Sequence, residues 1–288
     1  MCTLLFALFS GTTTQLSGVR CGLDWSAPSQ PQRVQSSSML TGDERLRDHY
    51  LDSVRDSILG LHLATPSIKP VLNNDLKQMP FDAFQRQRGG DWPAYGLSMI
   101  GRMRMDNLRA LLEDVLDCGV PGSFVGKCGL PPNTTAADSR EWSQSDFLRV
   151  PKSEVQSAFE RFGLLDERVH FHKGFFRHAL PAWWAQDKSP IAVLRLDGDM
   201  YESTMDELYN LWESISPGGY VIIDDWNIRV CRKAVTEFLA RNKLDYKVTK
   251  IDEWGAWFQK LDATPIDHSW YQQFNGSRTS DDVKSGRR

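Results

Sequence analysis

Four aspartates follow two short apolar runs in the second half of the chain. They are Asp197 and Asp199 after Ile191–Leu196, and Asp224 and Asp225 after Tyr220–Ile223. In an extended chain, residues two apart share a face, so Asp197 and Asp199 can point to the same side. Ligands of α/β sheets bind beyond the carboxyl ends of the strands. If the two runs are neighbouring strands, all four carboxylates therefore arrive at one edge of the sheet.

Carboxylates that crowd at one edge repel each other unless a cation lies among them. Oxygen ligands of this kind suit Mg²⁺, Ca²⁺ or Mn²⁺ rather than Zn²⁺. The alternative is that each aspartate caps the helix or turn after its strand, which is common for a single residue. Two acidic pairs at successive strand ends favour the cation site over four separate caps.

Hydrophobic periodicity predicts the elements that position these acids. Apolar residues at helical spacing predict helices over residues 44–63, 99–118, 152–163, 203–215 and 231–242. Short apolar runs predict strands over residues 168–175, 191–196, 220–223, 246–251 and 255–260. Residues 122–150 contain clusters of Gly, Pro, Asn and Ser and are predicted to form a loop. Strands that alternate with helices indicate an α/β fold with a mostly parallel sheet and helices on both faces.

The chain divides into four regions in this interpretation. A disordered leader covers residues 1–40, an N-terminal helical segment and lid 41–118, a Rossmann-like domain 119–262 and a flexible tail 263–288. With 288 residues, 41% of them hydrophobic, the chain can bury one sizeable core. The apolar run 3–9 has no basic residue before it, which argues against a signal peptide and leaves an organelle transit segment open.

Composition narrows the class of partner. The net charge of −3 and the absence of a basic stripe argue against nucleic acid. No run approaches the ~20 apolar residues that span a membrane, so no membrane partner is expected. The five cysteines are odd in number and widely spaced, which predicts reduced thiols and a cytoplasmic location. The sequence leaves open whether the chain forms a homo-oligomer.

The acids belong to a longer pattern with several specific motifs. The two main segments are Leu194-Arg-Leu-Asp-Gly-Asp-Met-Tyr-Glu-Ser-Thr204 and Ser216-Pro-Gly-Gly-Tyr-Val-Ile-Ile-Asp-Asp-Trp226. They are accompanied by Arg88-Gly-Gly-Asp-Trp-Pro93, Asp106-Asn-Leu108, Gly119-Val-Pro-Gly122, Lys173-Gly-Phe-Phe176 and a closing Trp257-Phe-Gln-Lys260. Over most of residues 44–260 this pattern resembles the macrocin O-methyltransferase family, whose members methylate sugar hydroxyls of macrolide and aminocoumarin antibiotics.

The resemblance implies a fold, a chemistry and a set of roles. The fold is a Rossmann-like class I methyltransferase sheet with an N-terminal helical extension, and the cofactors are S-adenosylmethionine (SAM) and Mg²⁺. Carried over by position, Asp197, Asp224 and Asp225 are the metal ligands and Asp199 is the general base. The acceptor is a small molecule that contains a sugar or polyol. The pKa of a sugar hydroxyl is far above neutral, so a cation that lowers it and a carboxylate that takes the proton suit the reaction.

Three aromatic residues lie near these motifs. Tyr201 follows the acids directly and either lines the site or packs in the core. Trp92 and Tyr95 lie in a segment that folds over the active site in the family. Buried packing is the expectation for both.

The segment that should bind SAM departs from the family pattern. A SAM-binding sheet needs a glycine-rich turn after its first strand and an acid after the second strand that holds the ribose hydroxyls. In the family these features separate the Gly-Val-Pro-Gly motif from a later Asp-Ser-Phe motif. Here Gly119–Gly122 runs directly into Ser123-Phe124, and Gly122 stands where the ribose-binding acid is expected. About 30 residues, the first strand–helix unit, are therefore predicted to be missing, with a gap left in the sheet.

Two functions from different classes stay open. The first is SAM-dependent, metal-assisted O-methyl transfer to a sugar or polyol hydroxyl. The second is a catalytically silent homologue that keeps the metal and acceptor site but not SAM. A metal-dependent hydrolase is a weaker third, because no nucleophile outside the acidic group is evident. The SAM-binding residues stay unassigned, and the missing segment reflects either altered splicing or a lineage that has lost catalysis.

Overall fold

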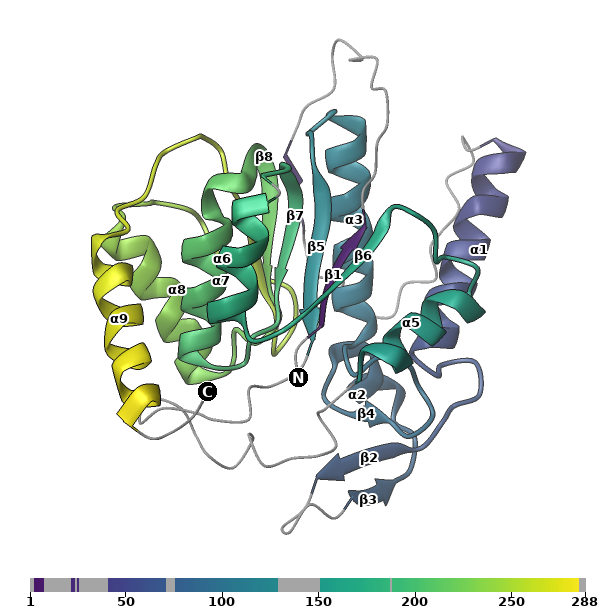
Figure 1. The fold of residues 1–288 in the computed structure, drawn as a ribbon. Helices are drawn as coiled ribbons and strands as arrows, with labels where there is room; N and C mark the ends of the chain where they lie inside the picture. Colours follow the sequence, from purple (N-terminus) through teal and green to yellow (C-terminus); the bar gives the residue numbers. More distant parts are fainter. Residues whose placement is uncertain are drawn as a thin grey trace. The chain divides into compact units, whose positions relative to one another are not determined.

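The computed structural model describes residues 3–7, 22, 23, 25, 41–70, 76–128, 151–186 and 188–284 (Figure 1). The chain forms two compact units. The first unit comprises Met1–Gly22, Val115–Thr249 and Trp257–Arg288, and the second comprises Leu23–Asp114 and Lys250–Ala256. None of the described helices is long and apolar enough to cross a membrane.

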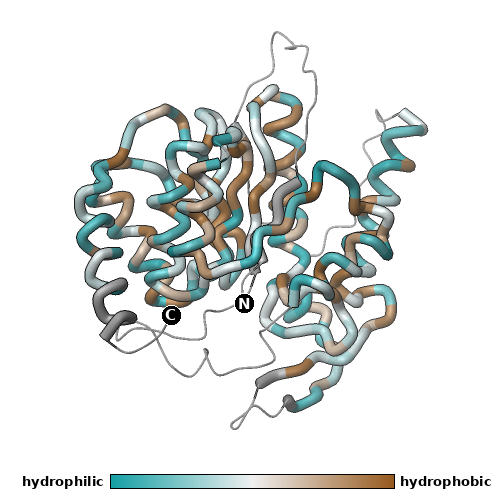
Figure 2. The backbone as a smooth tube through the Cα atoms, viewed as in Figure 1, coloured by the Kyte–Doolittle hydropathy of each residue, from teal (hydrophilic) through white to brown (hydrophobic). Residues whose placement is uncertain are grey.

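The first unit is built on one seven-stranded sheet. Its strands are β1 (Thr3–Ala7), β5 (Ser123–Cys128), β6 (Val169–Lys173), β7 (Ile191–Leu196), β8 (Ile215–Ile223), β9 (Thr249–Lys250) and β10 (Ala256–Gln259). They lie in the order β6-β1-β5-β7-β8-β10-β9. The central strand β7 pairs in parallel with β5 and β8. β7 and the second half of β8, Tyr220–Ile223, are almost entirely buried, so their sequences are nearly continuous apolar runs, which Figure 2 shows largely in brown.

Helices flank this sheet (Figure 1). They are α5 (Lys152–Arg161), α6 (Phe176–Gln186), α7 (Tyr201–Leu211), a short 3₁₀ helix (Trp212–Ser214) and α8 (Arg229–Arg241). α7 packs against both α6 and α8, and Leu208, Trp212 and Phe238 are fully buried at 0% exposure. α5, α7 and α8 coincide with predicted helices to within a few residues, whereas α6 was not predicted. The α/β class is therefore confirmed.

Residues Thr3–Ala7 form β1, although the sequence predicts a disordered leader there. β1 pairs antiparallel with β5 on one side and with β6 on the other, and Leu5 lies opposite both Gly126 and Phe171. The sheet is consequently continuous at the place where a gap was expected. Unpaired N–H and C=O groups on a strand edge attract another strand, and the apolar run near the N-terminus supplies one.

β5 lies within the segment 122–150 that was predicted to be a loop, so that prediction is wrong for residues 123–128. Gly122 just before it has a φ of +132°, and a Cβ there would lie 2.5 Å from the backbone nitrogen of Ala192. Only glycine lets the chain enter the sheet this close to β7. Pairing with a buried neighbour decides strand formation here, more than the local glycine content does.

The cysteines give a mixed outcome. Cys118 is disulfide-bonded, so the prediction of reduced thiols is wrong at that position. Cys231 is free and buried, and its Sγ lies 3.6 Å from the hydroxyl oxygen of Thr204.

The second unit contains helices and a small antiparallel sheet. The elements are α1 (Gly42–Ile58), β2 (Ser67–Pro70), β3 (Leu76–Met79), α2 (Ala83–Arg88), β4 (Trp92–Pro93) and most of α3 (Arg102–Asp117). The strand order is β3-β2-β4. α1 begins with a capping box in which Thr41 and Glu44 satisfy each other's backbone N–H groups. Its helices α1 and α3 lie where the sequence predicts helices, and its three short strands were not predicted.

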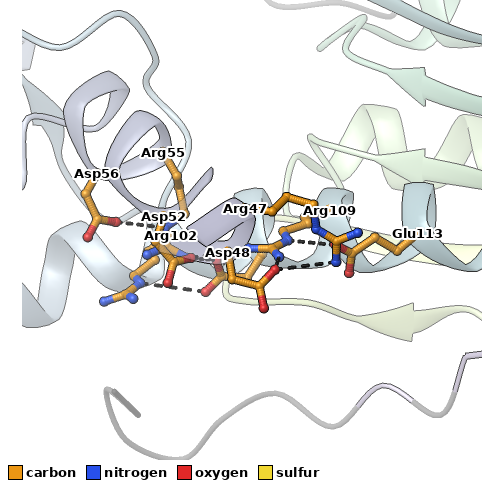
Figure 3. Close-up of polar contacts among 9 residues, drawn as sticks. Arg47, Asp48, Asp52, Arg55, Asp56, Arg102, Arg109 and Glu113 are labelled. Carbon is orange, nitrogen blue, oxygen red and sulfur yellow. Dashed lines mark hydrogen bonds and ion pairs between the residues drawn. The ribbon is translucent and has the colours of Figure 1, made fainter. Parts of the chain in front are cut away.

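Ion pairs join α1 to α3 (Figure 3). Arg55 contacts Asp106 at 2.6 Å, and Arg109 contacts Asp48 at 2.5 Å and Asp52 at 3.4 Å. We call the set the α1–α3 ion-pair network; it consists of Arg47, Asp48, Asp52, Arg55, Asp56, Arg102, Asp106, Arg109 and Glu113. Arginine and carboxylate alternate across the two helices, so each side chain meets opposite charge.

The last described element is α9 (Ser269–Lys284), which replaces much of the expected flexible tail. Tyr271 is buried and stacks on Tyr209 of α7, with 4.8 Å between ring centroids. Arg278 is also buried, at 6% exposure. The tail prediction is therefore wrong for these residues, because a few large side chains dock a helix whose overall composition is polar.

Candidate functional site

The acids lie at one edge of the sheet because β7 and β8 are adjacent and parallel. Leu196 at the end of β7 lies opposite Ile223 at the end of β8. Asp197 and Asp224 follow these residues directly, and the backbone N–H of Asp224 donates to the Leu196 carbonyl at 2.9 Å. The two apolar runs are therefore neighbouring strands, which is the condition under which the sequence places the acids at one edge.

Three of the four acids come together. One carboxylate oxygen from each of Asp197, Asp199 and Asp225 lies within 4.8 Å of the others; we call these three residues the acidic cluster. The backbone N–H of Asp199 also donates to Asp225 Oδ2 at 3.0 Å. Asp199 has a φ of +53°, a conformation that non-glycine residues adopt mostly at turns and functional sites.

Asp224 is held differently, by Arg195 in β7. The guanidinium of Arg195 lies 2.7 Å from Asp197 and 3.0 Å from Asp224. Both Arg195 and Asp224 are largely buried, with 17% and 8% of their side chains exposed. The sequence analysis did not identify Arg195 as a site residue. A single cationic side chain inside an apolar run that four acids follow could have indicated this role.

The electrostatics of Asp225 reflect the crowding. Its pKa is raised well above the usual 3.8, first by burial and then by the negative charges of Asp199, Asp197 and Asp224. The same environment raises the pKa of the nearby Cys231 thiol, where burial is the main cause and Asp225 adds to it. Uptake of a proton or a cation relieves this repulsion.

The loop that carries Asp197 and Asp199 rests on the start of α7. A Cβ at Gly198 would lie 2.9 Å from Glu207 Oε2 and 3.1 Å from Ser203 Cβ, so the loop backbone is in close contact with the first two turns. The backbone N–H and the hydroxyl of Thr204 both donate to the Met200 carbonyl, at 3.1 and 2.8 Å. α7 therefore fixes where the loop, and with it the acidic cluster, can lie.

The three aromatic residues take different positions. Tyr201 is buried, and its hydroxyl donates to Glu237 Oε2 at 2.6 Å; burial and then Glu237 raise its pKa. Trp92 is half-buried. Tyr95 is 76% exposed, so the expectation that it packs in the interior is wrong.

The part of the sheet around β5 is the part expected to bind SAM, and its strand arrangement differs from that around the acidic cluster. Residues 129–150, which follow β5, lie outside the described residues. β1 beside it is antiparallel, so Thr3, its first residue, lies opposite Cys128 at the carboxyl end of β5. At this position the described part of the chain has no parallel strand that ends in an acid, the usual ribose-binding feature.

The whole pattern has clear counterparts among known proteins. The family described as Macrocin-O-methyltransferase (TylF) matches residues 43–130 and 126–260. A protein of Streptomyces olivaceus named "8-demethyl-8-(2,3-dimethoxy-alpha-L-rhamnosyl)-tetracenomycin-C 4'-O-methyltransferase" is 33% identical over 77% of this chain and 96% of the relative. The demethyldecarbamoylnovobiocin O-methyltransferase of Streptomyces niveus is 34% identical over 61% of this chain and 80% of the relative.

A solved structure agrees with these matches. The O-methyltransferase NovP superposes with a TM-score of 0.66 at 30% identity, covering 75% of this chain and 99% of NovP.

The alignments also differ in length between the two partners. The match to the S. olivaceus protein spans 257 positions but 77% of this chain, which is about 222 of its 288 residues. The match to the S. niveus protein spans 212 positions but 61% of this chain, about 176 residues. In each case about 35 positions of the relative lack a counterpart here.

Proposed function

This chain belongs to the macrocin O-methyltransferase family, and from that membership we propose that it is built for metal-assisted methyl transfer from SAM to a hydroxyl of a sugar-containing small molecule. The observation that carries the proposal is the acidic cluster at the carboxyl edge of the sheet. Its relatives act on sugar-bearing natural products by name, including mycinamicin III in Micromonospora griseorubida.

The donor set suits a divalent cation. A hard cation such as Mg²⁺ or Mn²⁺ binds oxygen ligands at about 2.0–2.2 Å, so two of its ligands lie at most about 4.4 Å apart. The carboxylate oxygens of the acidic cluster lie within 4.8 Å of one another, close to that limit. Burial and mutual repulsion, which raise the pKa of Asp225, are also the conditions that a cation relieves.

The proposed roles follow the chemistry of the acceptor. Asp197, Asp224 and Asp225 are the proposed metal ligands; Asp197 and Asp225 lie in the cluster, and Arg195 holds Asp224 beside them. A cation held there would lower the pKa of an acceptor hydroxyl. Asp199 would take the proton from that hydroxyl, and SAM, when bound, would supply the methyl group to its oxygen and leave as the thioether. The backbone hydrogen bond from Asp199 to Asp225 keeps the base beside the ligands.

The SAM side supports a second candidate, a catalytically silent homologue. About 35 aligned positions of the relatives lack a counterpart in this chain. The strand beside β5 is antiparallel and comes from the N-terminus. We therefore propose that the chain as written binds SAM weakly or not at all, and that a version with the missing segment restored binds it.

A calorimetric titration of SAM into both versions separates the two functions. Each lost hydrogen bond to a charged group is worth about 1.5–3 kcal/mol, so the loss of two or three weakens a micromolar site to millimolar or worse. The restored version should then methylate demethyldecarbamoylnovobiocin or mycinamicin III. Mass spectrometry of the acceptor measures the added methyl group. Micromolar SAM binding by the unrestored chain would show that the proposed loss of the SAM site is wrong. A restored chain that binds SAM but methylates neither acceptor would contradict the proposed acceptor class.

A further inference from the structure

The C-terminal helix α9 lies outside the family match, which ends at residue 260. It packs on α7, the helix that follows residues 197–199, which we call the acidic loop. The Tyr271 hydroxyl donates to Asp206 Oδ1 at 2.7 Å, and Asn210 Nδ2 donates to the Tyr271 oxygen at 2.9 Å. The contact is thus built from specific hydrogen bonds as well as from the stacking of Tyr271 on Tyr209.

Arg278 is the second anchor of α9. Its guanidinium makes a two-point contact with Asp206, at 2.5 Å to Oδ1 and 3.2 Å to Oδ2, and a longer one to Glu202 at 3.3 Å. The same group lies over the Phe274 ring, 4.3 Å from its centroid. Arg278 and Asp206 are 6% and 4% exposed. Burial of a charge is unfavourable without a well-placed partner, so this pair fixes the register of α9 against α7.

α9 and the acidic loop contact different faces of the same two turns of α7. α9 contacts Glu202 and Asp206 through Arg278, and it contacts Tyr201 through Phe274, with ring centroids 6.2 Å apart in an edge-to-face arrangement. The loop contacts a different set, Ser203, Thr204 and Glu207, through Gly198 and Met200. Only one residue, Met200, separates Tyr201 from Asp199. A shift of these turns therefore moves the loop.

We propose that Arg278 is a positioning residue: by locking α9 onto α7, it holds the loop 197–199 in the arrangement that gathers Asp197, Asp199 and Asp225. The lock itself needs only the contacts above, whereas its effect on cation binding rests on the proposed function. α9 lies beyond residue 260, where the family match ends, so the match itself gives Arg278 no role.

Hydrogen exchange followed by mass spectrometry tests the lock in the full-length chain. In Arg278→Met, the rate of exchange in a peptide covering residues 197–202 should rise at least about tenfold. In the variant, local opening of this segment no longer requires that the buried Arg278–Asp206 pair be broken. The double variant Asp206→Asn/Arg278→Met should behave in the same way, which excludes the unpaired Asp206 carboxylate as the cause. Gln273→Ala, at an exposed position of α9, is the matched control and should leave exchange unchanged. A peptide covering β8 should exchange as in the unmodified chain, which excludes global unfolding.

Titration with Mn²⁺, read by the loss of the free-ion paramagnetic resonance signal, tests the consequence for the acids. Affinity should fall roughly 2- to 30-fold in Arg278→Met, the range of coupling through packed elements. Arg278→Lys should recover part of it, because it restores charge without the two-point contact. Unchanged exchange at residues 197–202 in Arg278→Met would overturn the lock. Unchanged Mn²⁺ affinity with faster exchange would overturn the positioning role. Absence of Mn²⁺ binding in the unmodified chain would instead contradict the proposed function and leave the exchange test standing.

Discussion

The acidic cluster and the α1–α3 ion-pair network both gather carboxylates, but they balance the charge in opposite ways. In the network, the one guanidinium of Arg55 contacts three carboxylates, those of Asp52, Asp56 and Asp106, at 2.6 to 2.8 Å (Figure 3). In the cluster, the carboxylates face one another, and the Arg195 guanidinium contacts Asp197 and Asp224. The number of acids in a region therefore does not distinguish a structural ion-pair network from a candidate site.

The cause of a pKa shift distinguishes the two regions better than its direction. The pKa of Asp106 in the network is raised by burial, and Arg55 opposes the shift. The pKa of Asp225 is raised by burial too, but there three neighbouring acids add to the shift. Burial next to an opposite charge is what a stable structure requires, whereas burial next to like charges costs stability and is typical of sites that bind or react.

The largest expected effect concerns Asp199, the proposed base. In a version that carries the segment proposed to be missing, Asp199→Asn should lower turnover about 10²–10⁴-fold and leave Mn²⁺ binding nearly unchanged, because the amide cannot accept the proton. Steady-state kinetics with labelled SAM measure it. Asp52→Asn in the network is the matched control and should keep full turnover. Equal losses in the two variants would remove the distinction between the regions.

The next effect concerns the most buried ion pair of the second unit. Arg86 is fully buried and contacts Asp91 at 2.9 Å while it also donates to the Leu59 and Thr65 carbonyls. Arg86→Met should lower the free energy of unfolding by about 3–5 kcal/mol, because it leaves the Asp91 carboxylate buried without its guanidinium. Urea denaturation measures this loss. A cost below 1 kcal/mol would show that buried pairing contributes little here.

Removal of one charge from the acidic cluster should, by contrast, raise the free energy of unfolding. Asp225→Asn removes one of the repelling charges, so in EDTA it should raise the free energy of unfolding by about 0.5–2 kcal/mol, as removal of unfavourable charges commonly does. Mn²⁺ at 100 times its Kd should stabilise the unmodified chain by about 2.7 kcal/mol. Asp225→Asn and Asp224→Asn should both abolish that stabilisation, measured by thermal unfolding. If Asp225→Asn destabilises the chain in EDTA, the acids are held by structural contacts and the comparison fails.

The smallest effect belongs to the exposed part of the network. Arg109 contacts Asp48 and Glu113 with 27% of its side chain exposed. Arg109→Met should cost only about 0.2–1 kcal/mol per pair, and the cost should shrink at high salt because solvent and ions screen these charges. Urea denaturation at low and high salt checks it. A cost that does not depend on salt would point to lost packing of the arginine stem in place of lost charge.

The sequence by itself determined the α/β class, the central strands and the place of the acids. Residues 191–196 are predicted and observed as a strand without any shift, because a buried parallel strand needs a continuous apolar run. The acids could be placed from the sequence because they follow two such strands directly, and parallel neighbours bring their carboxyl ends to one edge. Three helices of the first unit, α5, α7 and α8, followed from apolar periodicity in the same way, whereas α6 was not predicted.

Only the tertiary structure decided which residues contact one another across long stretches of the chain. The grouping of Asp199 with Asp197 and Asp225, and of Asp224 with Arg195, depends on a loop with positive φ and on the side-chain directions at two strand ends. β1, β5 and α9 were predicted as leader, loop and tail. β1 is an apolar run whose partner strands cannot be identified from the sequence, and β5 and α9 are weakly patterned. Strand pairing and a buried Arg278–Asp206 pair stabilise them, and these interactions join residues far apart in sequence, which local propensity does not encode.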